Sequence, residues 1–158
     1  MKSLQVLGLS AFAILLGACA SVEAPEQVPP QPAFVTKTCY GDVVGVYERA
    51  RSAITGRGLT IFNEINHTEN ALGVGVSLQS TQLIIFGNPK IGSALIAADR
   101  GMGFELPMRM LIWMEEGRIN VSVTNIDRFR DTYALSGQES RLEKAQSVLA
   151  AIQSEACG

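Results

Sequence analysis

The sequence of 158 residues has little histidine, tryptophan or cysteine: one, one and three residues respectively. With His67 as the only imidazole, a metal site built on several histidines is excluded, and no cysteine or carboxylate spacing around it matches a known ligand pattern. No Walker-type loop occurs, and no serine or cysteine lies in a nucleophile elbow. No basic patch stands out, which argues against nucleic acid as a partner. The sequence therefore predicts no metal and no cofactor, and it leaves enzymatic activity uncertain, with a non-catalytic role favoured.

The apolar run Leu4–Leu16 is too short to span a bilayer as a helix. It follows the positive charge of Lys2 and leads into a segment of small residues that ends at Cys19. This pattern resembles the signal peptide of bacterial lipoproteins. The resemblance implies cleavage before Cys19, lipidation of its thiol and acylation of the new amine, whereas an ordinary secretory signal is the alternative. Because residue 20 is alanine and not aspartate, the resemblance also implies a cell-envelope protein at the outer membrane, facing the periplasm.

Proline is scarce outside residues 21–34, which hold four of the six prolines, interspersed with glutamate and glutamine. That composition is typical of an extended, semi-rigid tether. We therefore predict a signal peptide at 1–18, a proline-rich tether at 19–34 and a single domain at 35–158. Removing residues 1–18 takes away only one charged side chain, Lys2, so the formal net charge changes from −2 to −3. The acyl chains on Cys19 would attach the domain to a membrane.

The three cysteines divide into one at the expected lipidation site and two near the ends of the domain. With Cys19 acylated, Cys39 and Cys157 remain as a pair in an oxidising compartment. A disulfide between them would tie the first strand to the last helix. Two buried thiols that do not bond are the alternative.

The hydrophobic pattern predicts an α+β fold, with a largely antiparallel, curved sheet and helices packed on one face. Strands are expected at 35–40, 59–65, 72–78, 83–86, 108–115 and 118–124, and helices at 43–54, 91–99 and 138–156. The expected order of elements is therefore β-α-β-β-β-α-β-β-α.

The segment 108–124 is expected to form a β-hairpin. A two-residue turn at 116–117 pairs Ile112 with Val121 on an apolar face, where the methionines of the first strand are expected to pack into the core. The opposite face carries Arg109 and Trp113. There the guanidinium could stack on the indole, clamp a carboxylate or simply reach solvent.

Several short motifs taken together resemble a known family. They are Asn66-His67, Gly73 and Gly75, Thr81, Phe86-Gly87-Asn88-Pro89-Lys90-x-Gly92, Leu106-Pro107-Met108-Arg109 and Trp113. This set is similar to the family catalogued as domain of unknown function 302 (DUF302), and the resemblance runs from about Val35 to the final helix. It implies a fold like that of the TATA-binding protein, with a curved antiparallel sheet and a long C-terminal helix. It also implies that no activity is established.

In two of these motifs the backbone is expected to be accessible to a ligand. Gly73 and Gly75 leave one face of the expected strand 72–78 bare, which often marks the close approach of a ligand or another backbone. Asn88 is a good N-cap for the following helix, whose first N–H groups, up to Gly92, could bind an anion beside the Lys90 ammonium. The alternative is a capped helix start with a solvated lysine.

His67 completes the predicted site, either as a ligand contact or general base, or as a loop imidazole that hydrogen-bonds the backbone. The predicted ligand-binding residues are His67, Gly73, Gly75, Asn88, Lys90, Gly92, Arg109 and Trp113. We expect the imidazole, the ammonium and the guanidinium to open onto one hollow lined by glycine backbone.

The function expected from the sequence is a membrane-anchored envelope lipoprotein that binds a small polar or anionic ligand without catalysis. One alternative is a structural or assembly module that docks an envelope protein partner or a second copy of the chain. The other is an enzyme with His67 as its general base.

Overall fold

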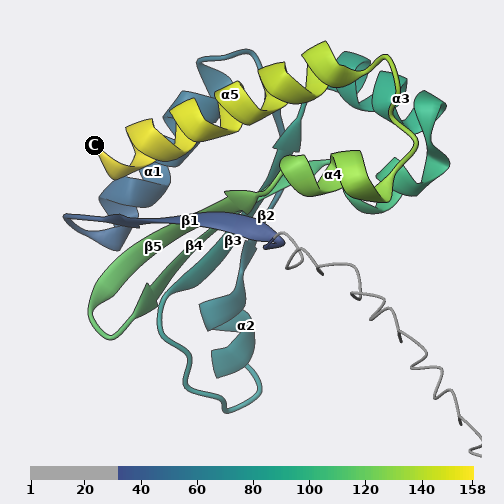
Figure 1. The fold of residues 1–158 in the computed structure, drawn as a ribbon. Coiled ribbons are helices and arrows are strands. Elements are labelled where there is room, and N and C mark those ends of the chain that lie inside the picture. The colour runs from purple at the N-terminus through teal and green to yellow at the C-terminus, as the bar shows by residue number, and fades with distance from the viewer. Residues whose placement is uncertain (1–31) are drawn as a thin grey trace, which may run out of the picture.

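The computed structural model describes residues 32–158 (Figure 1). The expected signal peptide, the lipidation site Cys19 and the expected tether up to residue 31 lie outside this range. None of the helices formed by residues 32–158 could span a bilayer, because none is both long enough and apolar enough.

Five strands form one antiparallel sheet in the order β1-β5-β4-β3-β2. The strands are β1 (Phe34–Cys39), β2 (Thr60–Asn66), β3 (Thr81–Gly87), β4 (Met108–Glu115) and β5 (Arg118–Thr124). The predicted α+β class with an antiparallel sheet is confirmed.

The helices differ in length and in the face of the sheet that they cover. They are α1 (Val43–Thr55), α2 (His67–Leu72), α3 (Pro89–Ala98), the 3-10 helix η1 (Arg100–Phe104), α4 (Asp127–Thr132) and α5 (Glu139–Cys157). The long helices α1 and α5 lie side by side over one face, whereas α2 lies away from them and packs against β3 (Figure 1).

The β4–β5 hairpin has the predicted bounds and register. Ile112 pairs with Val121, as expected from the alternation of apolar residues. The connecting turn consists of Glu116 and Gly117, with φ of 50° and 77°. Positive φ at both central residues is the signature of the turn type whose twist matches that of the flanking strands.

The predicted strand at 72–78 does not form. Instead, Asn66 caps α2 through a bond of 3.1 Å from the Glu69 N–H to its side-chain oxygen. At the other end the N–H of Gly75, whose φ is 76°, donates to the Leu72 carbonyl at 3.0 Å. These backbone groups therefore terminate a helix, which leaves them unable to pair with a strand, and glycine weakens a strand in any case.

The core fills the space between the sheet and helices α1 and α5. Phe86, Met110 and Ile112 from the central strands are at most 1% exposed. Because successive side chains along a strand point to opposite faces, the residues next to these three on each strand point to the other face of the sheet. The sheet thus has one face packed under the two long helices and another that stays open around α2.

The edge strand β1 is fastened at both of its ends. Cys39 at its C-terminal end forms a disulfide with Cys157, the last residue of α5, across a Cα–Cα distance of 4.6 Å. The two residues before the strand are bound by Asn125. Its backbone N–H donates to the Ala33 carbonyl at 3.1 Å, and its side-chain N–H donates to the Pro32 carbonyl at 2.9 Å.

Candidate functional site

A hollow of about 590 Å³ lies on the open face of the sheet. Arg109 and Trp113 reach it because they alternate with residues of β4 that face the helices. The lining residues are Ala33, Phe34, His67, Leu83, Arg109, Leu111, Trp113, Ser122, Val123, Thr124 and Arg128. Three of the predicted ligand-binding residues, from two elements distant in the sequence, therefore line one cavity.

A hydrogen-bonded centre fixes the indole at this hollow. Ser122 on β5 is only 4% exposed, although it lies on the open face. Its hydroxyl oxygen accepts the indole N–H of Trp113 at 3.0 Å and lies 2.8 Å from the hydroxyl of Thr36 on β1. Because both partners are held by strand backbone, the indole ring has a defined orientation against the floor of the cavity.

Two guanidinium groups at the hollow share one buried carboxylate. Glu105, which is 6% exposed, accepts a hydrogen bond of 2.8 Å from Arg128 on α4. Its second oxygen lies 3.6 Å from Nη2 of Arg109. Tyr133 also donates its hydroxyl to the carboxylate at 2.9 Å, and this bond raises the pKa of Tyr133 because it stabilises the protonated form of the hydroxyl.

The electrostatic character of the hollow follows from these positions. Its lining contains Arg109, Arg128 and His67, and none of the lining residues within 32–158 is a carboxylate, since Glu105 lies behind the two guanidinium groups. Arg109 is about half exposed and has further N–H donors available to a solute. The arrangement can therefore bind an anionic or polar group by charge-assisted hydrogen bonds.

His67 is placed by the start of helix α2. It is the first residue of that helix, directly after the N-cap Asn66. The neighbouring Thr68 holds the helix to the sheet, because its hydroxyl accepts the backbone N–H of Thr81 at 2.8 Å and donates to the carbonyl of Gln79 at 3.3 Å. These bonds hold His67 at the hollow on the open face, which Arg109 also lines.

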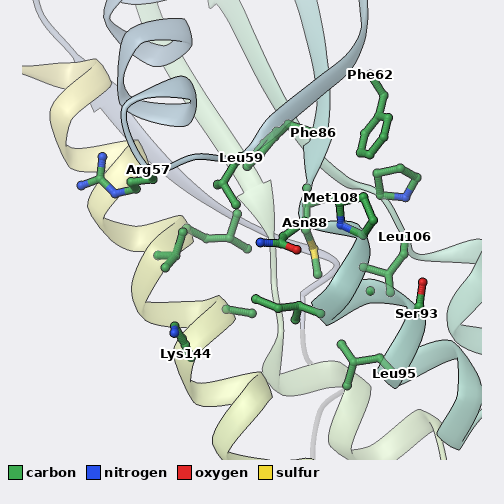
Figure 2. A pocket seen from close by; sticks show the side chains of 18 of the residues that line it. Arg57, Leu59, Phe62, Phe86, Asn88, Ser93, Leu95, Leu106, Met108 and Lys144 are labelled. Carbon is green, nitrogen blue, oxygen red and sulfur yellow. The ribbon is translucent and has the colours of Figure 1, made fainter.

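Asn88, Lys90 and Gly92 do not join this hollow. Asn88 caps α3 as predicted, accepting the Lys90 N–H at 3.0 Å, but Asn88 and Gly92 line a second cavity between α3 and α5 (Figure 2). The Lys90 side chain is exposed and lines neither cavity. The expected convergence of imidazole, ammonium and guanidinium on one hollow was therefore wrong, because the sheet lies between α3 and the open face.

Gly73 and Gly75 also have another role than the one predicted. Both are exposed and lie at the C-terminal end of α2, outside either cavity. A Cβ at Gly75 would meet nothing within 4 Å, so no ligand or backbone has to approach closely there. The positive φ of Gly75 is the reason for glycine at this position.

Sequence reasoning missed three residues of the open face. Ser122 could have been found, because it is the cross-strand neighbour of Leu111 and so falls on the face of Trp113. Arg128 and Glu105 are 23 residues apart in the sequence and belong to no motif. No local signal connects them, so their pairing becomes visible only in the folded chain.

The family model described as "Domain of unknown function DUF302" matches residues 34–154. The chain belongs to the DUF302 family. A crystal structure of an uncharacterized conserved DUF302 protein from Bacillus stearothermophilus has the same fold, with a TM-score of 0.70 at 14% sequence identity. The superposition covers 80% of this chain and 98% of that one, so the shared fold accounts for nearly all of the crystallised chain.

Among curated proteins, the DUF302 chain is similar to "Fluoride-specific ion channel FluC 1" of Brucella suis biovar 1 (strain 1330) and to the protein of that name from Brucella abortus biovar 1 (strain 9-941). Each is 36% identical over 91 residues, which is 58% of this chain. The match covers 35% of the first protein and 33% of the second. This chain thus spans about a third of the length of these relatives.

Proposed function

We propose that this DUF302 protein is an envelope lipoprotein, anchored through Cys19, whose domain binds a small polar or anionic ligand in the hollow on the open face of the sheet. The proposal rests on one observation above all. Arg109, Arg128 and His67 line the hollow together with hydroxyl groups, and no carboxylate among residues 32–158 lines it. The proposed role is binding without catalysis; within residues 32–158, no serine or cysteine side chain is hydrogen-bonded to His67 as an activated nucleophile would be.

Two further observations support parts of the proposal. The apolar run before Cys19 supports anchoring, and ion channels, such as the FluC relatives, are membrane proteins. The likeness to part of a protein with that name supports a position of this domain beside a membrane. The name of those relatives also makes fluoride the first inorganic anion to test, alongside phosphate and the tricarboxylate citrate, whose sizes better match the hollow.

Replacing Arg109 with alanine is expected to weaken binding of the preferred anion at least about tenfold, because a charge-assisted hydrogen bond to the ligand is lost. Trp113 is the only tryptophan of the chain and lies in the hollow, so its fluorescence and its indole N–H resonance report binding directly. Fluoride, phosphate and citrate would be titrated into residues 32–158 at low ionic strength.

Arg118→Ala is the matched control for this experiment. Arg118 lies on the same hairpin and also pairs with a glutamate, Glu116, but it is outside the hollow. Its removal should change the affinity less than twofold. If none of the three anions shifts the Trp113 signals at millimolar concentration, or if both variants weaken binding equally, the hollow is not the binding site.

A second function, docking of a membrane protein, is favoured by a different surface. The last residue of α2 and the segment that follows it expose four large apolar side chains: Leu72 (73%), Val74 (77%), Val76 (55%) and Leu78 (42%). Exposed apolar clusters of this kind mark interaction sites. The FluC relatives point to an integral membrane protein as the partner.

A photo-reactive phenylalanine at Val74 is expected to crosslink the full chain to one membrane protein in its native envelope. The same group at Val44 is the control, because Val44 is 64% exposed but lies on α1, on the other side of the sheet (Figure 1). A partner protein recovered equally from both positions, or from neither, would rule out docking through the segment after α2.

A further inference from the structure

The second cavity lies between α3 and α5, on the face of the sheet opposite the hollow (Figure 2). Its volume is about 410 Å³, within the range of small-molecule sites. Its floor consists of core residues, among them Phe86, Leu95 and Leu149, which are 1%, 0% and 3% exposed. A solute that enters the cavity would therefore contact the hydrophobic core directly.

Helix α3 supplies one wall of this cavity and is unusually apolar for its position. It reads Pro-Lys-Ile-Gly-Ser-Ala-Leu-Ile-Ala-Ala, yet Leu95 is its only buried residue. The helix packs mainly against η1. Ile91 and Ile96, together with Val148 on α5, instead line the cavity. These three side chains are only partly buried, so each leaves apolar surface that an apolar ligand could cover.

The charges at this cavity have one sign. Within residues 32–158, Arg57 and Lys144 are its only charged lining residues. Arg57 is engaged, since it donates to the Ala53 carbonyl at 2.9 Å and forms an ion pair with Glu155. Lys144 on α5 is exposed and forms no ion pair with any residue of the described part of the chain. Its ammonium is therefore available to an anionic group at the mouth.

From this combination we infer that the cavity binds a single-chain anionic amphiphile, a carboxylate with one alkyl chain. The chain lies between α3 and α5 over Leu95, and the carboxylate pairs with Lys144. The inference does not depend on the proposed anion site, because no residue lines both cavities. It assigns a lipid-like ligand to this cavity, whereas the hollow on the open face is proposed to bind a polar ligand.

Linear carboxylates from hexanoate to dodecanoate, kept below their micelle concentrations, would be titrated calorimetrically into residues 32–158. Affinity is expected to rise about fourfold for each added methylene until the cavity is filled, since each methylene leaves water for an apolar site. The heat capacity change should be negative for the same reason. An affinity independent of chain length would overturn the inference, as would a lack of binding throughout the series.

Ala145→Phe fills the cavity from α5 and should lower the affinity for dodecanoate at least about tenfold, because several methylenes lose their site. Ala150→Phe is the matched control, since Ala150 is exposed on the same helix and lies outside the cavity. If Ala145→Phe fails to fold, Gly92→Leu fills the cavity from α3, where an added Cβ meets only Leu106 at an ordinary 3.7 Å. Unchanged binding in a folded, cavity-filling variant would overturn the inference.

The role of the charge is tested with Lys144→Gln. This variant should weaken dodecanoate binding up to about fivefold, the range of an exposed ion pair, and leave dodecanol binding unchanged. The Trp113 indole resonance should not move when dodecanoate binds, because that residue lies on the other face of the sheet. Equal binding of the acid and the alcohol to the unsubstituted protein, or a shift of the Trp113 resonance alone, would assign the ligand differently and overturn the inference.

Discussion

Reduction of the Cys39–Cys157 disulfide is expected to lower the free energy of unfolding by about 4 kcal/mol. The two cysteines are 118 residues apart in the sequence, so the bond restricts nearly the whole domain when it is unfolded. The entropy that a crosslink removes from the unfolded chain grows with the length of the closed loop. Urea unfolding of residues 32–158, with and without reductant, measures the effect.

The double variant Cys39→Ala/Cys157→Ala provides the control. Its stability should not respond to reductant, whereas that of the unsubstituted domain should fall. Comparison of the variant with the reduced domain then separates the crosslink from packing, because both thiols remain in place in the reduced domain. A domain equally stable in both redox states would show that the long closed loop contributes nothing to stability.

Glu105→Gln is expected to cost about 2–3 kcal/mol of stability. The substitution keeps the shape of the side chain but removes the charge that holds Arg128 at 2.8 Å and Arg109 at 3.6 Å. It also weakens the acceptor of the Tyr133 hydroxyl. Because Glu105 is buried, water cannot replace the lost interactions as it would at the surface.

Glu116→Gln is the matched control, because the Glu116 side chain is 75% exposed and pairs with Arg118 at the surface at 2.8 Å. Its loss should cost less than about 1 kcal/mol. Added salt should reduce the contribution of Glu116 more than that of Glu105, since buried pairs are screened less. Equal costs for the two substitutions would mean that the buried carboxylate does not organise the two guanidinium groups.

The elements that the sequence predicted correctly depend on neighbours close in the chain. The helix expected at 43–54 forms as α1, and the carboxylate of Asp42 caps it by accepting the Gly45 N–H at 2.7 Å. The cap at Asn88 is formed in the same way. The β4–β5 register follows from alternation and a two-residue turn alone. Such features are predictable because the interacting groups are separated by only a few residues.

The segment after β2 was misassigned because two patterns competed within it. Alternating apolar residues from Leu72 onward favoured a strand, whereas the pair Asn66 and Glu69, three residues apart, is a helix-start pattern. The cap is formed and Gly75 closes the helix, so the apolar side chains end up exposed on a connecting segment. A strand also needs a partner edge, which a local pattern does not supply.

The separation of the predicted site residues onto two faces of the sheet could, by contrast, have been predicted from the sequence. The methionines of β4 were expected to face the helices and Arg109 to face away from them. A helix that begins after Asn88 and packs on the methionine face has to lie on the other side from Arg109. A single hollow and helices on one face only could therefore not both be correct. The structure places α3, the helix that follows Asn88, on the same side of the sheet as α5.

The fastening of β1 has a mechanical consequence under the proposed anchoring through Cys19. Tension applied between the chain that enters at Phe34 and a partner that holds the C-terminus would run along β1 and then through the bond from Cys39 to Cys157. The 117 residues between those two cysteines would carry none of the load along their backbone, since the covalent path bypasses them. The second cavity is lined entirely by residues of that unloaded part, and the hollow by all but Ala33 and Phe34. A pull on the proposed anchor would therefore load two lining residues of the hollow and none of the second cavity.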